Sequence, residues 1–204
     1  GTKIKQLGNK LKFEIKKLPK KEINQIKELH RLGFHININS GRGLYFLEKM
    51  FSSILPLVSL TYENGSATWL KGKVYQHVNS FSYLKDISEK LKKVRNKNIK
   101  GFEPKEFIIT IHCKKRVRKI ESIAKKYPKL YCIWNDEAYD IGLKKKQTKA
   151  VGLRKLIKLL KIKKKNVLAL GDNYNDKELL NVVGISVSAD KTRLNGDFYA
   201  PLNG

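Results

Sequence analysis

The sequence predicts an α/β protein with a parallel-sheet core and an inserted α+β domain. Short apolar runs alternate with amphipathic helices at both ends of the chain, an order of elements that is typical of a parallel sheet. Asn64-Gly65, a strong hairpin signal, interrupts this alternation and is followed by short strands and further helices. We therefore expect residues 1–61 and 144–204 to form the core, and residues 62–143 to form the inserted domain.

The elements follow from local signals. We expect residues 1–18 to be irregular apart from an alternating piece at 11–15. Pro19 opens a helix with an apolar stripe, and Gly33 ends it. The remaining expected elements are strands at 34–39, 57–60, 107–112, 130–134, 138–141, 166–170 and 185–188, and helices at 44–53, 83–94, 116–127, 149–160 and 176–182.

The composition is strongly basic, with 44 Lys and Arg against 18 Asp and Glu and a formal charge of +26. The excess is mostly lysine and runs along the whole chain, which favours a solvated surface over a dedicated nucleic-acid site. No apolar run is long enough to span a membrane. Cys113 and Cys132 fit reduced, buried thiols, so we expect a cytoplasmic protein. The oligomeric state does not follow from the sequence.

One stretch near the C-terminal end carries candidate metal ligands. An apolar run at 166–170 predicts a buried strand, and Gly171 allows a sharp turn after it. Asp172 and Asp176 then lie at the carboxyl end of that strand, where open α/β sheets bind ligands. Two carboxylates there suit Mg²⁺. The same residue types also cap helices, so a simple helix start remains an alternative.

Two further features fit an anion site. Ser40, Gly41 and Arg42 follow a strand and precede a helix, so their hydroxyl and N–H groups can hold a phosphate or serve as an ordinary helix cap. Lys149 begins a helix, where its charge opposes the helix dipole and suggests a function. Residues 144–146 are competing lysines. A hydroxyl, a lysine and a carboxylate-bound cation together suit phosphoryl transfer.

This order of motifs resembles the haloacid-dehalogenase superfamily of phosphatases. Ser40, Lys149 and the Asp172/Asp176 pair match its second, third and fourth motifs, with a cap inserted between the second and third. The resemblance implies a Rossmann-like core, Mg²⁺ as cofactor, and a cap of the kind found in the branch that acts on sugar phosphates.

Part of the inserted region resembles trehalose-6-phosphate phosphatases. Glu103, Lys105 and His112 match that family's Glu-x-Lys … His-x-Arg stretch, while Lys114 replaces its Arg and Asp140 stands near its sugar-binding Glu. The resemblance implies that these five residues bind a small sugar phosphate. The alternative is a polar rim in which His112 only pairs with a neighbour.

The superfamily's first motif, Asp-x-Asp-Gly-Thr, has no counterpart beyond Gly1-Thr2. We interpret these two residues as the end of that motif, although chance or a cloning remnant would also explain them. The first strand and the nucleophilic Asp that forms an aspartyl-phosphate would then be missing, and the 204-residue chain should be inactive. The expected substrate is trehalose 6-phosphate. The alternatives are another sugar phosphate, a non-catalytic binding protein, and nucleic-acid binding.

Overall fold

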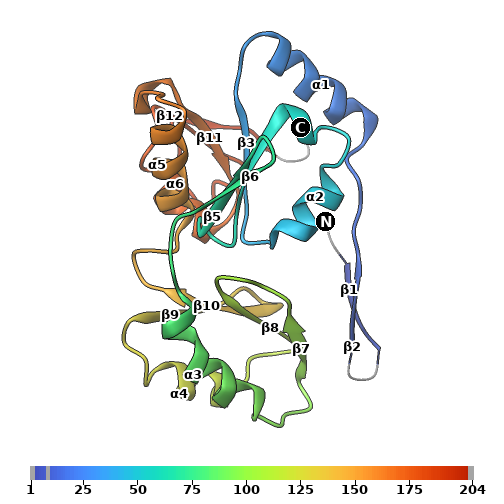
Figure 1. The fold of residues 1–204 in the computed structure, drawn as a ribbon, viewed down its shortest axis with the longest axis vertical. Coiled ribbons are helices and arrows are strands. Elements are labelled where there is room, and N and C mark those ends of the chain that lie inside the picture. Colours follow the sequence, from blue (N-terminus) through green and yellow to red (C-terminus); the bar gives the residue numbers. More distant parts are fainter. Residues whose placement is uncertain (1–2, 8–9, 202–204) are drawn as a thin grey trace.

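The computed structural model describes residues 3–7 and 10–201 and confirms an α/β fold with a parallel-sheet core. The core lies above a smaller layer of strands and helices, and two chain segments connect them (Figure 1). Gly1 and Thr2, on which the interpretation of the first motif rests, lie outside the described residues.

The first part of the core is a parallel strand pair flanked by helices. Strand β3 runs parallel to β4, with Ile36 opposite Val58. Helices α1 and α2 surround this pair, and an apolar cluster of α2, β4 and Phe107 is buried beneath. The elements are α1 (Lys20–Arg31), β3 (Ile36–Asn39), α2 (Leu44–Met50), the 3₁₀ turn η1 (Leu55–Leu57) and β4 (Val58–Tyr62).

The Asn64-Gly65 signal marks a hairpin, as expected, but the domain boundary placed there differs from the structure. Strands β5 (Ala67–Leu70) and β6 (Lys73–Gln76) pair antiparallel to β4 and to each other. They extend the core sheet to the order β3-β4-β5-β6. Backbone pairing with β4 thus assigns residues 67–76 to the core sheet, and the smaller layer begins after them.

The second part of the core comes from the C-terminal end of the chain. Helix α5 packs against β3 and β4, and a second parallel sheet has the order β11-β12-β13. The elements are α5 (Lys149–Leu159), the 3₁₀ turn η2 (Lys164–Asn166), β11 (Leu168–Gly171), the 3₁₀ turn η3 (Tyr174–Asp176), α6 (Lys177–Leu180), β12 (Ile185–Ser188) and β13 (Phe198–Tyr199).

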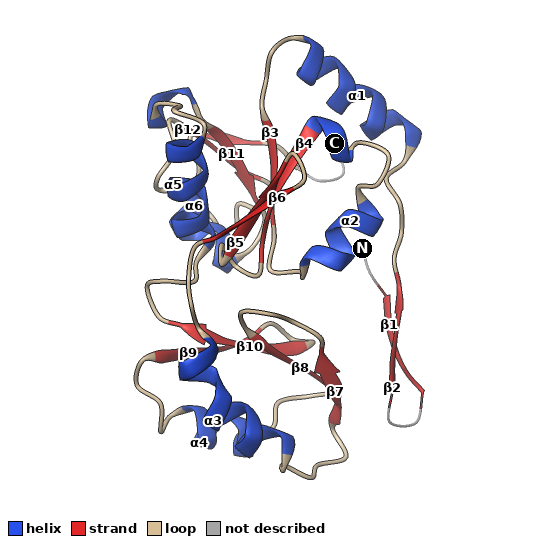
Figure 2. Cartoon of the chain, in the orientation of Figure 1, coloured by secondary structure: helices blue, strands red, loops and turns tan. Residues whose placement is uncertain are grey.

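The smaller layer, here called the inserted domain, is an antiparallel sheet with both helices on the face away from the core (Figure 2). Ile109, Ile111 and Cys113 pack into the cluster under the helices. Because strand side chains alternate, Thr110 and His112 project from the opposite face, toward the core. The sheet order is β7-β8-β10-β9. The elements are α3 (Phe81–Lys92), β7 (Ile99–Glu103), β8 (Ile109–Cys113), α4 (Arg118–Ala124), β9 (Leu130–Trp134) and β10 (Ala138–Leu143).

The N-terminal region is more regular than expected: the alternating piece at 11–15 largely coincides with β2, and a strand that was not expected precedes it. Strands β1 (Lys3–Leu7) and β2 (Lys10–Glu14) form a hairpin that stands beside both layers (Figure 1). The Phe13 ring lies 4.8 Å from the Phe46 ring of α2, and Leu11 contacts β7 at Gly101. Packing against two other elements, which local sequence does not reveal, stabilises this hairpin.

Four strand edges of the two core sheets, those of β3, β6, β11 and β13, have no partner strand among the described residues. β3 pairs with β4 alone, and β11 pairs with β12 alone. The strand predicted at 166–170 forms as β11 but is not buried, since Leu168 and Leu170 are 54% and 61% exposed. The stripe predicted on α1 is packed in its first half only: Ile23 and Ile26 lie against the core cluster, and Leu29 and Leu32 are exposed. Within residues 3–7 and 10–201, we find no helix with the length and apolarity that a membrane crossing needs.

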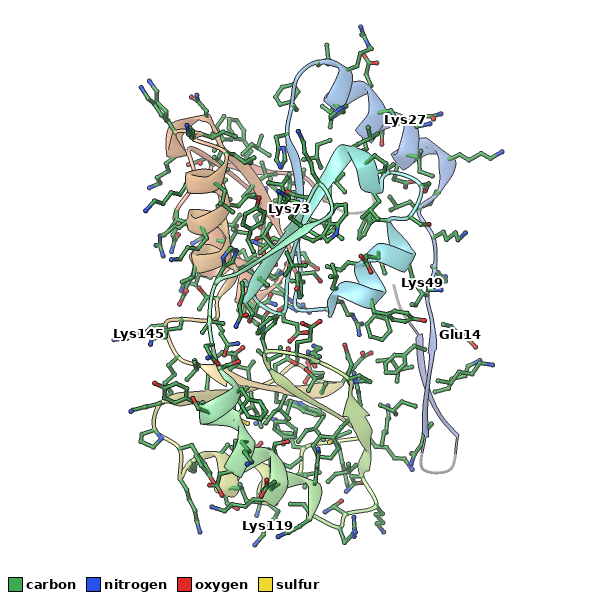
Figure 3. The ribbon with its side chains drawn as sticks, viewed as in Figure 1. Glu14, Lys27, Lys49, Lys73, Lys119 and Lys145 are labelled. Carbon is green, nitrogen blue, oxygen red and sulfur yellow. The ribbon has the colours of Figure 1, made fainter. Side chains whose placement is uncertain are left out.

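Exposed lysines occur on both layers of the described part of the chain. Five labelled lysines, each exposed, come from different parts of both layers: Lys27, Lys49, Lys73, Lys119 and Lys145 (Figure 3). This distribution agrees with a solvated basic surface.

Candidate functional site

The carboxyl end of β3 and the start of α5 meet in the core. The Asn39 amide donates to the Lys149 carbonyl oxygen at 2.9 Å. Ser40 follows Asn39 directly, and its N–H bonds the Thr61 carbonyl oxygen. The fold therefore brings Ser40 and Lys149, separated by most of the chain, to the same edge of the sheet.

Lys149 is fixed by a carboxylate rather than solvated. Thr148 caps α5 by accepting from the Val151 N–H at 3.3 Å, which leaves Lys149 in the first turn. The Lys149 Nζ lies 2.6 Å from Asp176 Oδ1, and the two side chains are 12% and 4% exposed. Asp176 compensates the unfavourable position of a cation at a helix N-terminus. The competing lysines at 144–146 are exposed.

Asp176 and Asp172 have different surroundings, although both were predicted to bind metal. Asp176 Oδ2 accepts from the N–H groups of Asp172 and Asn173 at 3.3 Å, so both of its oxygens are engaged. Asn173 caps the η3 turn, and Asp176 completes a capping box. The helix-cap alternative is thus fulfilled by Asn173 and Asp176. The Asp172 carboxylate is exposed and has no bonding partner among the described residues.

Gly171 permits this arrangement, because an added Cβ would lie 2.5 Å from the Asp176 Cβ. A free carboxylate at a strand end suits a hard cation, and Asp172 meets that requirement. Asp176 is already committed to Lys149. The described part of the chain contains no group of three or more acidic, His or Cys side chains that could hold a metal ion by itself.

The Ser40 loop, residues 40–42, does not cap a helix in the way that was considered. Gly43 stands at the N-cap of α2, and Ser40 Oγ accepts from the Arg42 N–H at 3.1 Å. The hydroxyl closes a local turn at the end of β3 instead. From the inserted domain, Lys105 Nζ donates to the Gly41 carbonyl oxygen at 2.8 Å.

Most of the residues predicted to bind substrate form one buried polar cluster. Glu103 Oε2 lies 2.7 Å from His112 Nε2 and 3.6 Å from Arg42 Nη1, and Glu103 Oε1 lies 3.5 Å from Lys105 Nζ. Burial raises the pKa of Glu103, but the His112 hydrogen bond and the Lys105 and Arg42 charges outweigh it and lower the pKa overall. The alternative that His112 only pairs with a neighbour is therefore correct in one respect, because His112 hydrogen-bonds to Glu103.

Asp140 belongs to this cluster and Lys114 does not contact it. Asp140 Oδ1 accepts from Thr110 Oγ1 at 2.5 Å and lies 3.8 Å from Lys105 Nζ, with 19% of its side chain exposed. Lys114 lies one residue beyond β8, and its side chain is exposed. Among the cluster residues of the inserted domain, Asp140 is thus better placed to meet a ligand than the more deeply buried Glu103, Lys105 and His112.

Several polar residues of this region escaped the sequence analysis. Asn39 and Asn64 each carry a buried side-chain oxygen without a protein partner among the described residues. Glu63 is 1% exposed, and Tyr131 reaches Asn64 from the inserted domain. Glu63 and Asn64 read as hairpin-turn residues, and nothing local in the sequence distinguishes them from ordinary turn residues.

Comparison with known proteins identifies a family. A family model described as haloacid dehalogenase-like hydrolase matches residues 78–192. A curated protein of Streptococcus pyogenes serotype M6, provisionally named a bifunctional phosphatase/peptidyl-prolyl cis-trans isomerase, is 40% identical over 55 residues. That match covers 27% of this chain and 12% of the relative, so the chain spans about an eighth of the relative's length.

Solved structures share the fold. A hypothetical protein from Geobacillus kaustophilus superposes with a TM-score of 0.72 at 21% identity, covering 91% of this chain and 86% of the other. BT1666 from Bacteroides thetaiotaomicron, described among phosphatases of the haloalkanoate superfamily, gives 0.71 at 16% identity, covering 91% and 83%. The subclass IIB sugar phosphatase BT4131 gives 0.67 at 16% identity, covering 91% and 86%.

Proposed function

Because the chain belongs to the haloacid dehalogenase-like hydrolase family, we propose that its site hydrolyses the phosphate monoester of a small sugar. The observation that carries this proposal is the meeting of the Ser40 loop, Lys149 and Asp176 at the ends of β3 and β11. A hydroxyl, a positioned ammonium and a free carboxylate lie at the edge where α/β sheets bind ligands. Phosphoryl transfer depends on such positioning and charge neutralisation.

Each residue of this chain has a defined task in the proposed site. Ser40 Oγ and the Gly41 N–H bind phosphoryl oxygens, because the N–H groups of Ser40 and Arg42 already donate within the protein. Lys149 Nζ neutralises their charge, and Asp176 holds that ammonium in place at 2.6 Å. Because the pair is largely buried, the ammonium is already oriented before a ligand arrives.

Asp172 is the residue of this chain that would contact Mg²⁺. Bound there, Mg²⁺ supplies Lewis-acid neutralisation of the phosphoryl oxygens. The exposed, unpaired carboxylate of Asp172 fits this role. Asp176 acts indirectly, through Lys149 and through the two N–H groups that shape the turn after β11.

The nucleophile would come from a further strand. β3 and β11 each keep one edge without a partner in the described residues, and both run parallel to their neighbours. We place an additional parallel strand of the intact protein between them, because it would cover the exposed Leu168 and Leu170. An aspartate at its carboxyl end would lie beside Ser40, Lys149 and Asp172.

The inserted domain would select the sugar. Its polar cluster faces the core and offers the carboxylate of Asp140, which is suited to sugar hydroxyls, while Glu103 and His112 largely satisfy each other. Trehalose 6-phosphate is the first substrate to test, on the resemblance carried by Glu103, Lys105 and His112. Other sugar phosphates are the second choice, and the exposed Lys114 weakens the more specific assignment.

Phosphate release from a panel of sugar phosphates tests this proposal in the intact protein, preceded by its natural N-terminal segment. Lys149→Met should lower kcat by about 100-fold or more, since it removes a buried charge aimed at the phosphoryl group. Lys146→Met removes an exposed lysine three residues earlier and should leave kcat unchanged. Equal activity of the two variants would refute the assignment of Lys149.

The 204-residue chain alone provides a second test. Without the additional strand it should release no phosphate above the background of an Asp172→Ala, Ser40→Ala variant. Turnover by this chain would show that the nucleophile lies within it, and the proposed strand would then be wrong. Phosphate binding without turnover in the intact protein would instead favour a non-catalytic binding protein.

A further inference from the structure

The connection between β4 and β5 has an unusual backbone. Glu63, Asn64 and Gly65 have φ angles of +47°, +54° and +80°, three consecutive left-handed residues. Asparagine and glycine tolerate this conformation in tight turns, but for a residue such as glutamate it costs about 1–2 kcal/mol and persists only where the surroundings fix it. The left-handed Glu63 therefore calls for a specific reason.

This left-handed turn holds the Ser40 loop. The Glu63 N–H donates to the Arg42 carbonyl oxygen at 3.0 Å, and the Asn64 N–H donates to the Ser40 carbonyl oxygen at 3.1 Å. These N–H groups bind carbonyl oxygens of the loop and fix its path at the end of β3.

The inserted domain in turn holds the left-handed turn. The Glu63 carboxylate accepts from three consecutive backbone N–H groups of the β7–β8 connection: Glu106 at 3.0 Å, Phe107 at 2.7 Å and Ile108 at 3.1 Å. Hydrogen bonds to a charged acceptor are about twice as strong as neutral ones. The Asn64 amide also donates to the Tyr131 hydroxyl of β9 at 3.3 Å.

The β7–β8 connection is itself anchored to the core. The Phe107 ring packs into the core cluster 6.0 Å from the Tyr62 ring. The Phe107 carbonyl oxygen accepts from Ser80 Oγ and Gln147 Nε2, each at 2.7 Å. Residues 106–108 therefore form a firm support for the Glu63 carboxylate rather than a loose loop.

We propose that Glu63 is a positioning residue that transmits the docking of the inserted domain to the Ser40 loop. Its carboxylate accepts hydrogen bonds from the N–H groups of residues 106–108, and the backbone N–H groups of the same turn donate to the carbonyl oxygens of Arg42 and Ser40. The importance of the Ser40 loop rests on the phosphate site proposed above. When the inserted domain undocks and residues 106–108 move with it, the turn loses these three hydrogen bonds and holds the Ser40 loop less firmly.

Hydrogen exchange measured by NMR on the 204-residue chain tests the link without any assay of catalysis. Glu63→Gln places an NH₂ group against backbone donors. It should speed exchange about tenfold or more at the amides of residues 106–108 and at the amides of residues 63 and 64. Tyr131→Phe, a milder change, should speed exchange at Asn64. Glu106→Gln alters an exposed neighbour and should change none of these amides.

Faster exchange at residues 106–108 with unchanged exchange at residues 63 and 64 would overturn the proposal, because the effect would then stop at the support. Exchange at Ile111, inside the inserted domain, should stay constant, and a general rise there would mean unfolding. In that case Tyr131→Phe decides the outcome: unchanged exchange at Asn64 overturns the proposal, and faster exchange supports it.

Inorganic phosphate provides a second arm. Its dissociation constant, followed by the Gly41 amide shift, should rise about tenfold in Glu63→Gln and stay constant in Glu106→Gln. If the wild-type chain binds no phosphate, the phosphate site is wrong, while the exchange data still decide whether Glu63 positions the loop. An unchanged constant in Glu63→Gln, with phosphate bound, overturns the proposed transmission.

Discussion

Gly152→Ala separates the effect of helix propensity from the effect of packing at the base of the site. Gly152 lies inside α5, where alanine would normally stabilise the helix by about 1 kcal/mol. An added Cβ would, however, lie 2.6 Å from the Gly65 Cα and 2.6 Å from the Thr61 Cγ2. The first neighbour is backbone of the left-handed turn, which cannot move freely.

Overpacking usually costs about 1–3 kcal/mol, and this double overlap belongs at the upper end or above. After subtracting the gain in propensity, we expect a net loss of about 2 kcal/mol. For a chain of this size, that corresponds to a melting temperature lower by about 4–8 °C. Thermal unfolding followed by circular dichroism measures the shift, with exposed Arg154→Ala on the same helix as a control that stays within about 0.5 kcal/mol. A higher melting temperature for Gly152→Ala would refute the close approach of α5 to the turn.

Three further outcomes follow from charges and burial. Asp176→Ala leaves Lys149 buried and unpaired, and should lower the free energy of unfolding in urea by about 3–5 kcal/mol. As a control, Asp86→Ala breaks an exposed ion pair and should lower it by less than about 1 kcal/mol. Equal losses in the two variants would contradict the burial of the Lys149–Asp176 pair. Because the pKa of Glu103 is lowered in the folded chain, its charge stabilises the fold fully at pH values above the usual carboxyl pKa of 4.5, and progressively less as the pH falls below 4.5. Glu103→Gln should therefore be less stable than wild type at pH 7, and the difference in stability should shrink on acidification below pH 4.5. Burial raises the pKa of the Cys113 thiol to about 11, so a thiol reagent at pH 8 should modify it slowly before unfolding and rapidly in urea; fast modification of the folded chain would contradict this.

The core elements were predictable because their signals are local. The strand expected at 185–188 coincides with β12, and the helix expected after Pro19 begins at the next residue as α1. The domain boundary expected after residue 61 differs from the structure, because the sequences of β5 and β6 have the features of any short hairpin. Only their pairing with β4 assigns them to the core sheet. The hairpin β1–β2 escaped detection for the same reason, since contacts with α2 and β7 stabilise it.

In the candidate site, too, some residues could be predicted from the sequence and others only from contacts in the fold. Ser40, Lys149 and Asp176 could be proposed from their order in the chain, because strand ends in an α/β sheet converge. Glu63 could not, because its role depends on backbone N–H groups some forty residues away. The bond between Asp176 and Lys149 could not be predicted either, since the same spacing suggests a metal ligand.

Burial distinguishes the two lysines of the proposed site from the solvent-exposed cations of this chain. With 44 Lys and Arg residues, a lysine near a motif carries little information by itself. Lys105 and Lys149 are 3% and 12% exposed, and each lies beside a buried carboxylate, Glu103 or Asp176. Desolvating an ammonium costs several kcal/mol unless a partner compensates it, so chance would rarely place two such lysines at the meeting of the two layers. Their position supports a site built for an anion more strongly than the overall charge of +26 does, because that charge is spread over the whole surface.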